Sequence, residues 1–87
     1  MYFVYILECV DGTLYTGVTN DIEKRLLAHN GGKTGARYTR GRRPVTLLYT
    51  EECGTKGEAL QREAVVKKLT RQQKLLLVHV PTQAENN

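Results

Sequence analysis

The segment Tyr2–Cys9 (YFVYILEC) constrains the fold more than any other part of the chain. It is rich in aromatic and β-branched residues, as is typical of a β-strand, and both of its alternating faces are apolar. A strand that is apolar on both faces has to be covered on both faces. We therefore expect it to be the central strand of a small sheet, with helices packed against that sheet.

A tight turn leads from this segment to a second strand, 14–18 (LYTGV). A two-residue turn would put Tyr5 and Tyr15 on opposite faces of the sheet. A three-residue loop, with Gly12 in the left-handed conformation, pairs Tyr5 with Gly17 and puts both tyrosines on one face. We predict the three-residue loop, which leaves an open spot beside the Tyr5 hydroxyl because Gly17 has no side chain.

A helix is expected to follow over 21–30, because apolar residues recur there with helical spacing. Asn20 is predicted to cap its first turn, and Glu23 three residues later makes a near capping box. Gly31 and Gly32 supply the C-terminal stop.

The buried stripe of this helix carries the first candidate functional residues. Ile22, Leu26 and His29 fall within a narrow stripe that should face the core, and Arg25 lies at its edge. Because Arg25 and His29 are four residues apart, we expect their side chains to reach the same point in space.

The second half of the chain reads as a strand and two helices. The third strand is expected over 45–51. Helices are expected over 56–69 and 71–79, and each begins at a Thr-x-x-Glu or Thr-x-x-Gln capping box, at Thr55 and at Thr70. The element order is β-β-α-β-α-α, which predicts an α+β fold with a small antiparallel or mixed sheet.

A chain of 87 residues buries one core, so we expect a single domain over 1–80 and a disordered polar tail over 81–87. It has 40% hydrophobic and 25% charged residues, with no apolar run or signal-peptide pattern. These features predict a cytoplasmic protein that does not enter membranes. Cys9 and Cys53 fit neither a metal knuckle nor a disulfide framework and are expected to be reduced thiols.

The net charge of +4 is concentrated in the segment 33–43, which holds five basic residues and no acidic one. A solvated loop is the ordinary explanation of such a run. The neighbouring glycines and one tyrosine favour instead a surface that approaches a nucleic-acid backbone, with one helical turn around 36–38. The candidate nucleic-acid contacts are Lys33, Arg37, Tyr38, Arg40, Arg42 and Arg43.

Glu63 falls within a largely apolar arc of the helix expected over 56–69, close to Ala59 and Leu60. A carboxylate in such a position needs a partner, because burying an unpaired charge is costly. Two partners are open: an ion pair with Lys67, four residues on, or a bound cation.

The other candidates also have ordinary interpretations, since strand tyrosines and a buried histidine are common in protein cores. Phosphodiester hydrolysis needs a base for water, a cation at the developing charge, and a ligand for a metal. Tyr5 or Tyr15, Arg25 and Glu63 match these needs.

Four short segments resemble, in their order and spacing, the motifs of the GIY-YIG nuclease superfamily. They are Phe3-Val4-Tyr5, Tyr15-Thr16-Gly17, residues 21–25 and Arg62-Glu63. The resemblance runs over about 2–78 and is strongest to the small bacterial group often called YhbQ or YazA-like. The stretch 29–41 is also similar to the catalytic subunit of eukaryotic structure-specific endonucleases.

The resemblance implies a three-stranded antiparallel sheet flanked by helices and metal-dependent cleavage of DNA. It implies that Tyr15 activates water, with Tyr5 positioning the water or sharing that role. Arg25 would stabilise the phosphate charge, His29 would assist proton transfer or contact phosphate, and Glu63 would hold one divalent cation, Mg²⁺ or Mn²⁺. The positive charge of Arg25 and of the metal would lower the pKa of the tyrosine base.

The chain departs from the family pattern at Phe3, Val4 and Thr16, and no asparagine follows Glu63 until the tail. It is also expected to lack the separate targeting domain that most nucleases of this family have. We therefore expect a monomer that binds DNA, with RNA as an alternative, and that has a protein partner for targeting. The rival hypothesis is a nucleic-acid-binding module with the nuclease fold and little turnover; a domain used only for protein contacts is a third.

Overall fold

The computed structural model describes residues 1–31 and 41–79 of the chain. Its elements follow the order β-β-α-β-α-α, and the fold is α+β, as the sequence predicts. The elements are β1 (Tyr2–Cys9), β2 (Leu14–Thr19), α1 (Ile22–Gly31), β3 (Val45–Cys53), α3 (Lys56–Lys67) and α4 (Arg71–His79).

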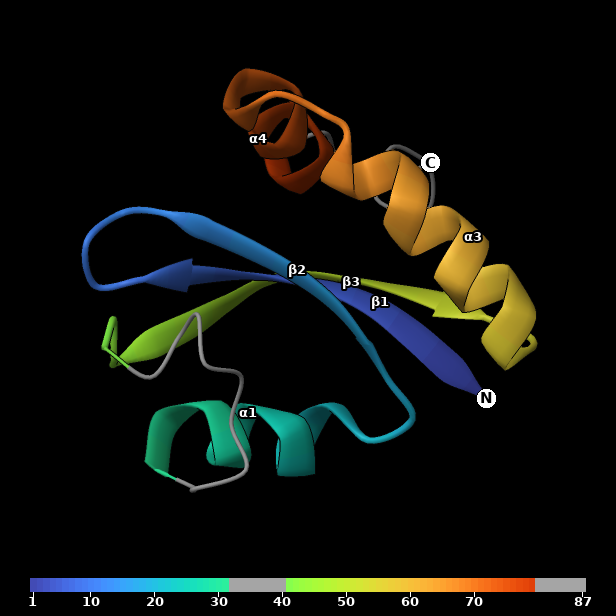
Figure 1. Ribbon diagram of the computed structural model, residues 1–87, viewed down its shortest axis with the longest axis horizontal. Coiled ribbons are helices and arrows are strands. Elements are labelled where there is room, and N and C mark those ends of the chain that lie inside the picture. The colour runs from blue at the N-terminus through green and yellow to red at the C-terminus, as the bar shows by residue number, and fades with distance from the viewer. Residues whose placement is uncertain (32–40, 80–87) are drawn as a thin grey trace, which may run out of the picture.

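The three strands form one antiparallel sheet in the order β2-β1-β3, which confirms β1 as the central strand. Figure 1 shows three layers, with α1 against one face of the sheet and α3 and α4 against the other. Both faces of β1 are therefore covered, as its apolar composition requires.

The α3 side of the sheet buries an aliphatic core. Val4 and Ile6 of β1 pack with Ala59 and Val66 of α3, and all four are fully buried. Leu77 of α4 packs against this cluster from the side. The cluster fixes α3 on the sheet.

The α1 side of the sheet has a core of mixed chemistry. Tyr5, Leu7 and Cys9 of β1 are buried there, and Ile22 and Leu26 of α1 pack against them. The predicted buried stripe of α1 is thus confirmed. Because Tyr5 is part of this cluster, a polar hydroxyl is carried into an otherwise apolar layer.

The hairpin between β1 and β2 has the predicted three-residue loop. The Cys9 N–H donates to the Thr13 carbonyl at 2.8 Å, and Gly12 has a φ of +86°. Tyr5 pairs with Gly17 in this register. The prediction of an open spot above Gly17 is wrong, however, because the ring and hydroxyl of Tyr5 fill the space that a side chain at Gly17 would occupy.

The cap of α1 also differs from the prediction. Asp21, and not Asn20, is the N-cap, since its carboxylate accepts the Lys24 N–H at 3.0 Å and its carbonyl accepts the Arg25 N–H at 3.0 Å. The Thr19 hydroxyl accepts the Asp21 N–H at 3.1 Å. This short turn holds the chain in a non-helical conformation for one residue more than expected.

The capping boxes of the later helices are confirmed. The Thr55 hydroxyl accepts the Glu58 N–H at 3.1 Å, and the Glu58 carboxylate accepts the Thr55 N–H at 3.1 Å. Thr70 and Gln73 exchange the same pair of bonds at the start of α4. β3 runs two residues further than expected, because its end pairs with Tyr2, and α3 ends two residues earlier.

Several predictions lie outside the described residues. These are the helical turn around 36–38, the tail 81–87, and the candidate contacts Lys33, Arg37, Tyr38 and Arg40. Cys9 and Cys53 are both free thiols. Within 1–31 and 41–79, no helix has the length and apolar character needed to cross a membrane.

Candidate active site

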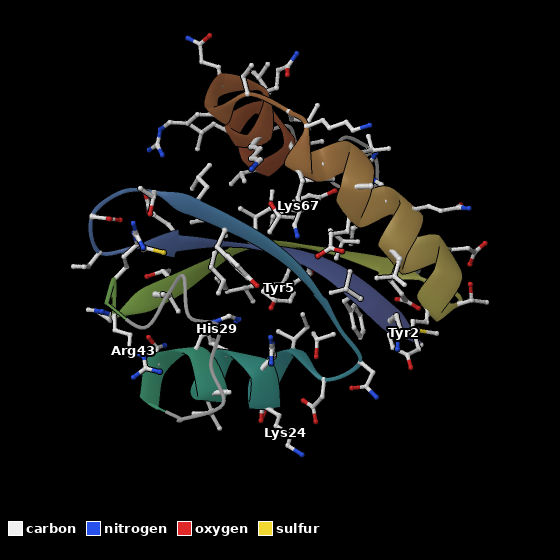
Figure 2. The ribbon with its side chains drawn as sticks, in the orientation of Figure 1. Tyr2, Tyr5, Lys24, His29, Arg43 and Lys67 are labelled. Carbon is white, nitrogen blue, oxygen red and sulfur yellow. The ribbon has the colours of Figure 1, made fainter. Side chains whose placement is uncertain are left out.

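The Tyr5 hydroxyl is the meeting point of two predicted site residues. It lies 2.9 Å from Nε2 of His29 and accepts a hydrogen bond from Nε of Arg25 at 3.3 Å. Figure 2 shows Tyr5 and His29 facing each other between the sheet and α1. The prediction that Arg25 and His29 reach one point in space is confirmed.

The protonation of His29 follows from its surroundings. Burial, and then the positive charges of Arg25 and Arg43, lower the pKa of His29 from 6.5 to about 4. At neutral pH the imidazole is therefore uncharged, and one ring nitrogen accepts a hydrogen bond. Because Arg25 can only donate to Tyr5, we assign the Tyr5 proton to the hydrogen bond with Nε2 of His29. This arrangement satisfies all three groups.

The expected lowering of a tyrosine pKa does not occur at Tyr5. Burial raises the pKa of Tyr5 above 10.0, and this effect outweighs the hydrogen bond and positive charge of Arg25, which act in the opposite direction. The Tyr5 side chain is only 2% exposed. Its hydroxyl therefore stays protonated at neutral pH and acts here as a link between Arg25 and His29.

Tyr15 lies on the same face of the sheet and is less buried than Tyr5. Its ring centroid is 6.4 Å from that of Tyr5 and 5.2 Å from that of His29. Contacts with Tyr5 and then Tyr15 raise the pKa of Arg25, so the guanidinium lies against both hydroxyls and stays charged. The four predicted residues on this side of the sheet are thus brought together.

A cleft of about 450 Å³ joins this cluster to the opposite layer of the molecule. Tyr5, Tyr15 and Arg25 line it from the α1 side, whereas Glu63 lines it from α3. The two layers meet at β2, the edge strand, where Gly17 adds no side chain to the wall. Four of the five predicted catalytic residues therefore line one cleft from both faces of the sheet, whereas His29 is buried behind it and contacts Tyr5.

Glu63 has the partner that its spacing predicts. Its carboxylate lies 3.3 Å from Nζ of Lys67 in an i, i+4 ion pair, and its side chain is 19% exposed against 54% for Lys67. Figure 2 shows Lys67 reaching from α3 towards the sheet. The carboxylate is therefore held at the cleft by a cation that is itself half in solvent.

The donor set at the cleft fits a hard divalent cation held mainly by water and substrate. Within the described residues there is no group of three or more carboxylate, imidazole or thiol side chains that could hold a metal. Mg²⁺ keeps several waters and is commonly bound through one or two carboxylates together with phosphate oxygens. Glu63 is the carboxylate in the lining of this cleft that could hold such an ion.

Two of the six predicted nucleic-acid contacts are described, and both hold the fold together. Arg42 forms an ion pair with Asp11 at 3.0 Å, and its carbonyl accepts the Val10 N–H. Arg43 donates to the backbone carbonyls of Ala28 and His29 at the end of α1. These bonds join the start of β3 to the hairpin and to the helix that carries His29.

Sequence reasoning did not find three further features of the site. Lys56 and Tyr2 line the cleft, and neither has a spacing that relates it to the other residues. Arg62 forms an ion pair with Glu51 of β3 at 3.0 Å, and Glu51 also accepts the Tyr49 hydroxyl at 2.8 Å. This pair ties α3 to the sheet beside Glu63. Only the fold brings these residues together, since Glu51 and Arg62 are eleven residues apart.

Comparisons with known proteins agree with this geometry. The family model of the GIY-YIG catalytic domain matches residues 1–75. UPF0213 protein CPE1444 of Clostridium perfringens is 55% identical over 87 residues, which is all of this chain and 92% of that protein. UPF0213 protein VNG_2274C of Halobacterium salinarum is 54% identical over 85% of this chain and 95% of that protein.

Two solved structures are similar to the whole fold. The NMR structure of the UPF0213 protein BH0048 from Bacillus halodurans is 45% identical, with a TM-score of 0.59, and the match covers 98% of this chain and 90% of that one. The NMR structure of EF2693 from E. faecalis is 41% identical, with a TM-score of 0.62, over 94% and 90% of the two chains. None of these names states an activity.

Proposed function

The chain belongs to the GIY-YIG catalytic domain family, and from this premise we propose that it is a divalent-metal-dependent endonuclease that hydrolyses DNA phosphodiester bonds. The observation that carries the proposal is the convergence of His29 and Arg25 on the Tyr5 hydroxyl, in the wall of a cleft that Glu63 also lines. Structured or damaged DNA, as met in repair or recombination, is the proposed substrate. The similarity of the stretch 29–41 to structure-specific endonucleases supports that choice.

Tyr15 is the proposed base. It lines the cleft and is the more exposed of the two tyrosines, whereas the Tyr5 hydroxyl is buried between Arg25 and His29. In this proposal the Tyr15 hydroxyl first loses its own proton to solvent. The Tyr15 oxygen then takes a proton from the attacking water, the water oxygen bonds to phosphorus, the bond from phosphorus to the leaving ester oxygen breaks, and that oxygen takes a proton from solvent. A phenol accepts a proton only as its phenolate, and positive charge nearby stabilises that form.

Arg25 is proposed to bind the phosphate during the reaction. Its guanidinium lies at the cleft between the two tyrosine hydroxyls and is held there by Tyr5. A fixed cation stabilises the negative charge that develops on the phosphoryl oxygens, and removal of such a group typically costs about 10²- to 10³-fold in rate. His29 acts indirectly in this scheme, because it orients Tyr5 and through Tyr5 the guanidinium.

Glu63 would hold one Mg²⁺ or Mn²⁺ ion, with water and a phosphate oxygen completing the coordination. When bound, the ion would supply Lewis-acid polarisation of the phosphoryl group. The ion pair with Lys67 holds the Glu63 carboxylate at the cleft.

The decisive experiment is cleavage of labelled single-stranded, duplex and branched DNA at low salt with Mg²⁺ or Mn²⁺. We expect cleavage by the wild-type protein and its loss in Glu63→Gln and Arg25→Ala, with DNA binding by Glu63→Gln retained. Glu52→Gln, at an exposed position of β3, is the matched control and should cleave normally. Melting temperatures show whether each variant is folded.

Two outcomes would contradict the proposal. Cleavage that survives in Glu63→Gln would remove the metal-binding role and point to a contaminating nuclease. DNA that the wild-type protein retards but does not cut, with either metal, would favour the rival interpretation, a nucleic-acid-binding module that acts with a partner.

A further inference from the structure

A second pocket lies at the start of β2, next to the cleft, whose lining along this strand begins at Tyr15. It has a volume of about 200 Å³ and is lined by Thr13 and Leu14 at the start of β2 and by Arg71 and Lys74 of α4. Arg71 donates a hydrogen bond to the Gly12 carbonyl, which places its guanidinium beside the hairpin. Two cations from one helix therefore face one small hollow.

Lys74 is the less exposed of these two cations. Burial, and then the positive charge of Lys67, lower the pKa of the Lys74 ammonium below 10.5. Within residues 1–31 and 41–79, Lys74 has no carboxylate within ion-pair distance. A partly buried cation that faces another cation is stabilised by a bound anion, and a phosphate group presents several oxygens to such a pair.

Lys67 connects this pocket to the cleft. It pairs with Glu63 on one side and repels Lys74 on the other, so positive charge continues along α3 and α4 beside β2. Leu14 at the pocket is directly followed along β2 by Tyr15, which lines the cleft, so the two sites are neighbours beside this strand.

We propose that the Arg71–Lys74 pocket binds a backbone phosphate of the same nucleic-acid strand whose scissile phosphate lies in the cleft. The inference rests on the proposed function and adds a substrate requirement to it. Because both sites lie beside the edge strand β2, one nucleic-acid strand can place a phosphate in each. The pocket thus anchors the strand beside the cleavage site.

The test measures binding of labelled oligonucleotides to the full chain by fluorescence anisotropy in EDTA, where no cleavage occurs. Lys74→Met keeps most of the apolar stem and removes the charge, and Arg71→Gln removes the second cation. Each is expected to weaken binding of a 16-nucleotide strand about three- to tenfold and to lower the slope of log affinity against log salt by about one.

Three comparisons make the test specific. A dinucleotide has one internucleotide phosphate and cannot occupy both sites at once, so its affinity should change less than twofold in either variant. Lys68→Gln removes the same charge from the end of α3 without lining the pocket, and should change affinity less than twofold. Lys74→Arg should restore binding of the longer strand. Equal losses on both strand lengths, or with Lys68→Gln, would overturn the proposal.

An NMR titration separates a nucleic-acid phosphate from a free one. The 16-nucleotide strand should shift the amide signals of Thr13, Leu14 and Lys74 at micromolar concentration, whereas inorganic phosphate should do so only at millimolar concentration. Shifts with inorganic phosphate alone would overturn the inference. Wild-type cleavage without any effect of the pocket variants would reject the anchor and leave the proposed nuclease intact, whereas absence of both binding and cleavage would reject the nuclease itself.

Discussion

The Tyr5 hydroxyl lies 2.9 Å from Nε2 of His29, although the two residues are 24 positions apart and belong to β1 and α1. Both side chains are almost completely buried. The bond joins the central strand to the helix on one face of the sheet, and Arg25 meets the same hydroxyl from the cleft side. A single phenol thus connects the core of the α1 layer with the proposed phosphate-binding cation.

The two tyrosines should respond differently to loss of their hydroxyls. Tyr5→Phe removes a hydrogen-bond partner from His29 and from Arg25, so unfolding free energy should fall by about 1 to 3 kcal/mol. Tyr15→Phe should cost less than about 1 kcal/mol but lower the cleavage rate about 10²- to 10⁴-fold, as expected for loss of a general base. Urea denaturation and single-turnover cleavage measure the two effects. Full activity in Tyr15→Phe would remove it from the chemistry.

Gly17→Ala should displace Tyr5. A Cβ atom at Gly17 would lie 2.5 Å from the Tyr5 hydroxyl and 2.6 Å from its ring carbon Cζ, so the ring has to move and its bond to His29 is lost. We expect a loss of about 1 to 3 kcal/mol in the free energy of unfolding. Gly57→Ala is the control, because its nearest neighbour is at 3.9 Å, and it should leave stability unchanged or higher. Equal stability of the two variants in urea would contradict this packing.

The free energy of unfolding should decrease as the pH is lowered through the range in which His29 is protonated in the unfolded chain but not in the folded one. Its pKa is 6.5 in the unfolded chain and about 4 in the fold. Between these values the unfolded chain binds a proton that the folded chain does not, so unfolding becomes easier as pH falls. The free energy of unfolding should fall by at most about 3 kcal/mol because of His29, and this decrease is complete near pH 4.

The measurement for His29 is urea denaturation from pH 7 to pH 4 on the wild type and on His29→Gln. Glutamine does not titrate, and its amide can still accept the Tyr5 hydrogen bond. Because the carboxylates titrate in both proteins, the difference between the two curves isolates His29. Parallel curves would show that the imidazole has an ordinary pKa.

Lys67→Met should increase affinity for divalent metal. The Lys67 ammonium lies 3.3 Å from the Glu63 carboxylate and competes with a cation for it. A half-exposed ion pair is worth about 0.5 to 1 kcal/mol, so its removal should raise Mn²⁺ affinity roughly two- to fivefold. Isothermal titration calorimetry with Mn²⁺ measures this directly, with Lys68→Met as the charge-matched control and Glu63→Gln as the variant that abolishes binding. Weaker binding in Lys67→Met would show that the ammonium supports the site.

The sequence alone predicted the elements of the fold and part of the site, because these depend on short-range patterns. The apolar character of both faces of Tyr2–Cys9 identified the central strand, and the three-residue loop with Gly12 gave a hairpin register in which Tyr5 and Tyr15 share a face. Helical spacing brought Arg25 and His29 to one point. One error, Asn20 in place of Asp21 as the cap of α1, arose because the Thr19 hydroxyl holds Asp21 outside the helix.

Only the tertiary structure decided how these residues work together. Glu63 reaches the tyrosines from the opposite layer, around the edge strand, and no spacing along the chain encodes that path. The Tyr5 pKa rises, although Arg25 donates to it, because burial depends on the atoms of all the elements packed around the ring. Hydrogen bonds between residues three or four positions apart can be predicted from the sequence. Desolvation of a side chain, and its contacts with a distant layer, depend on how all the elements of the fold pack around it.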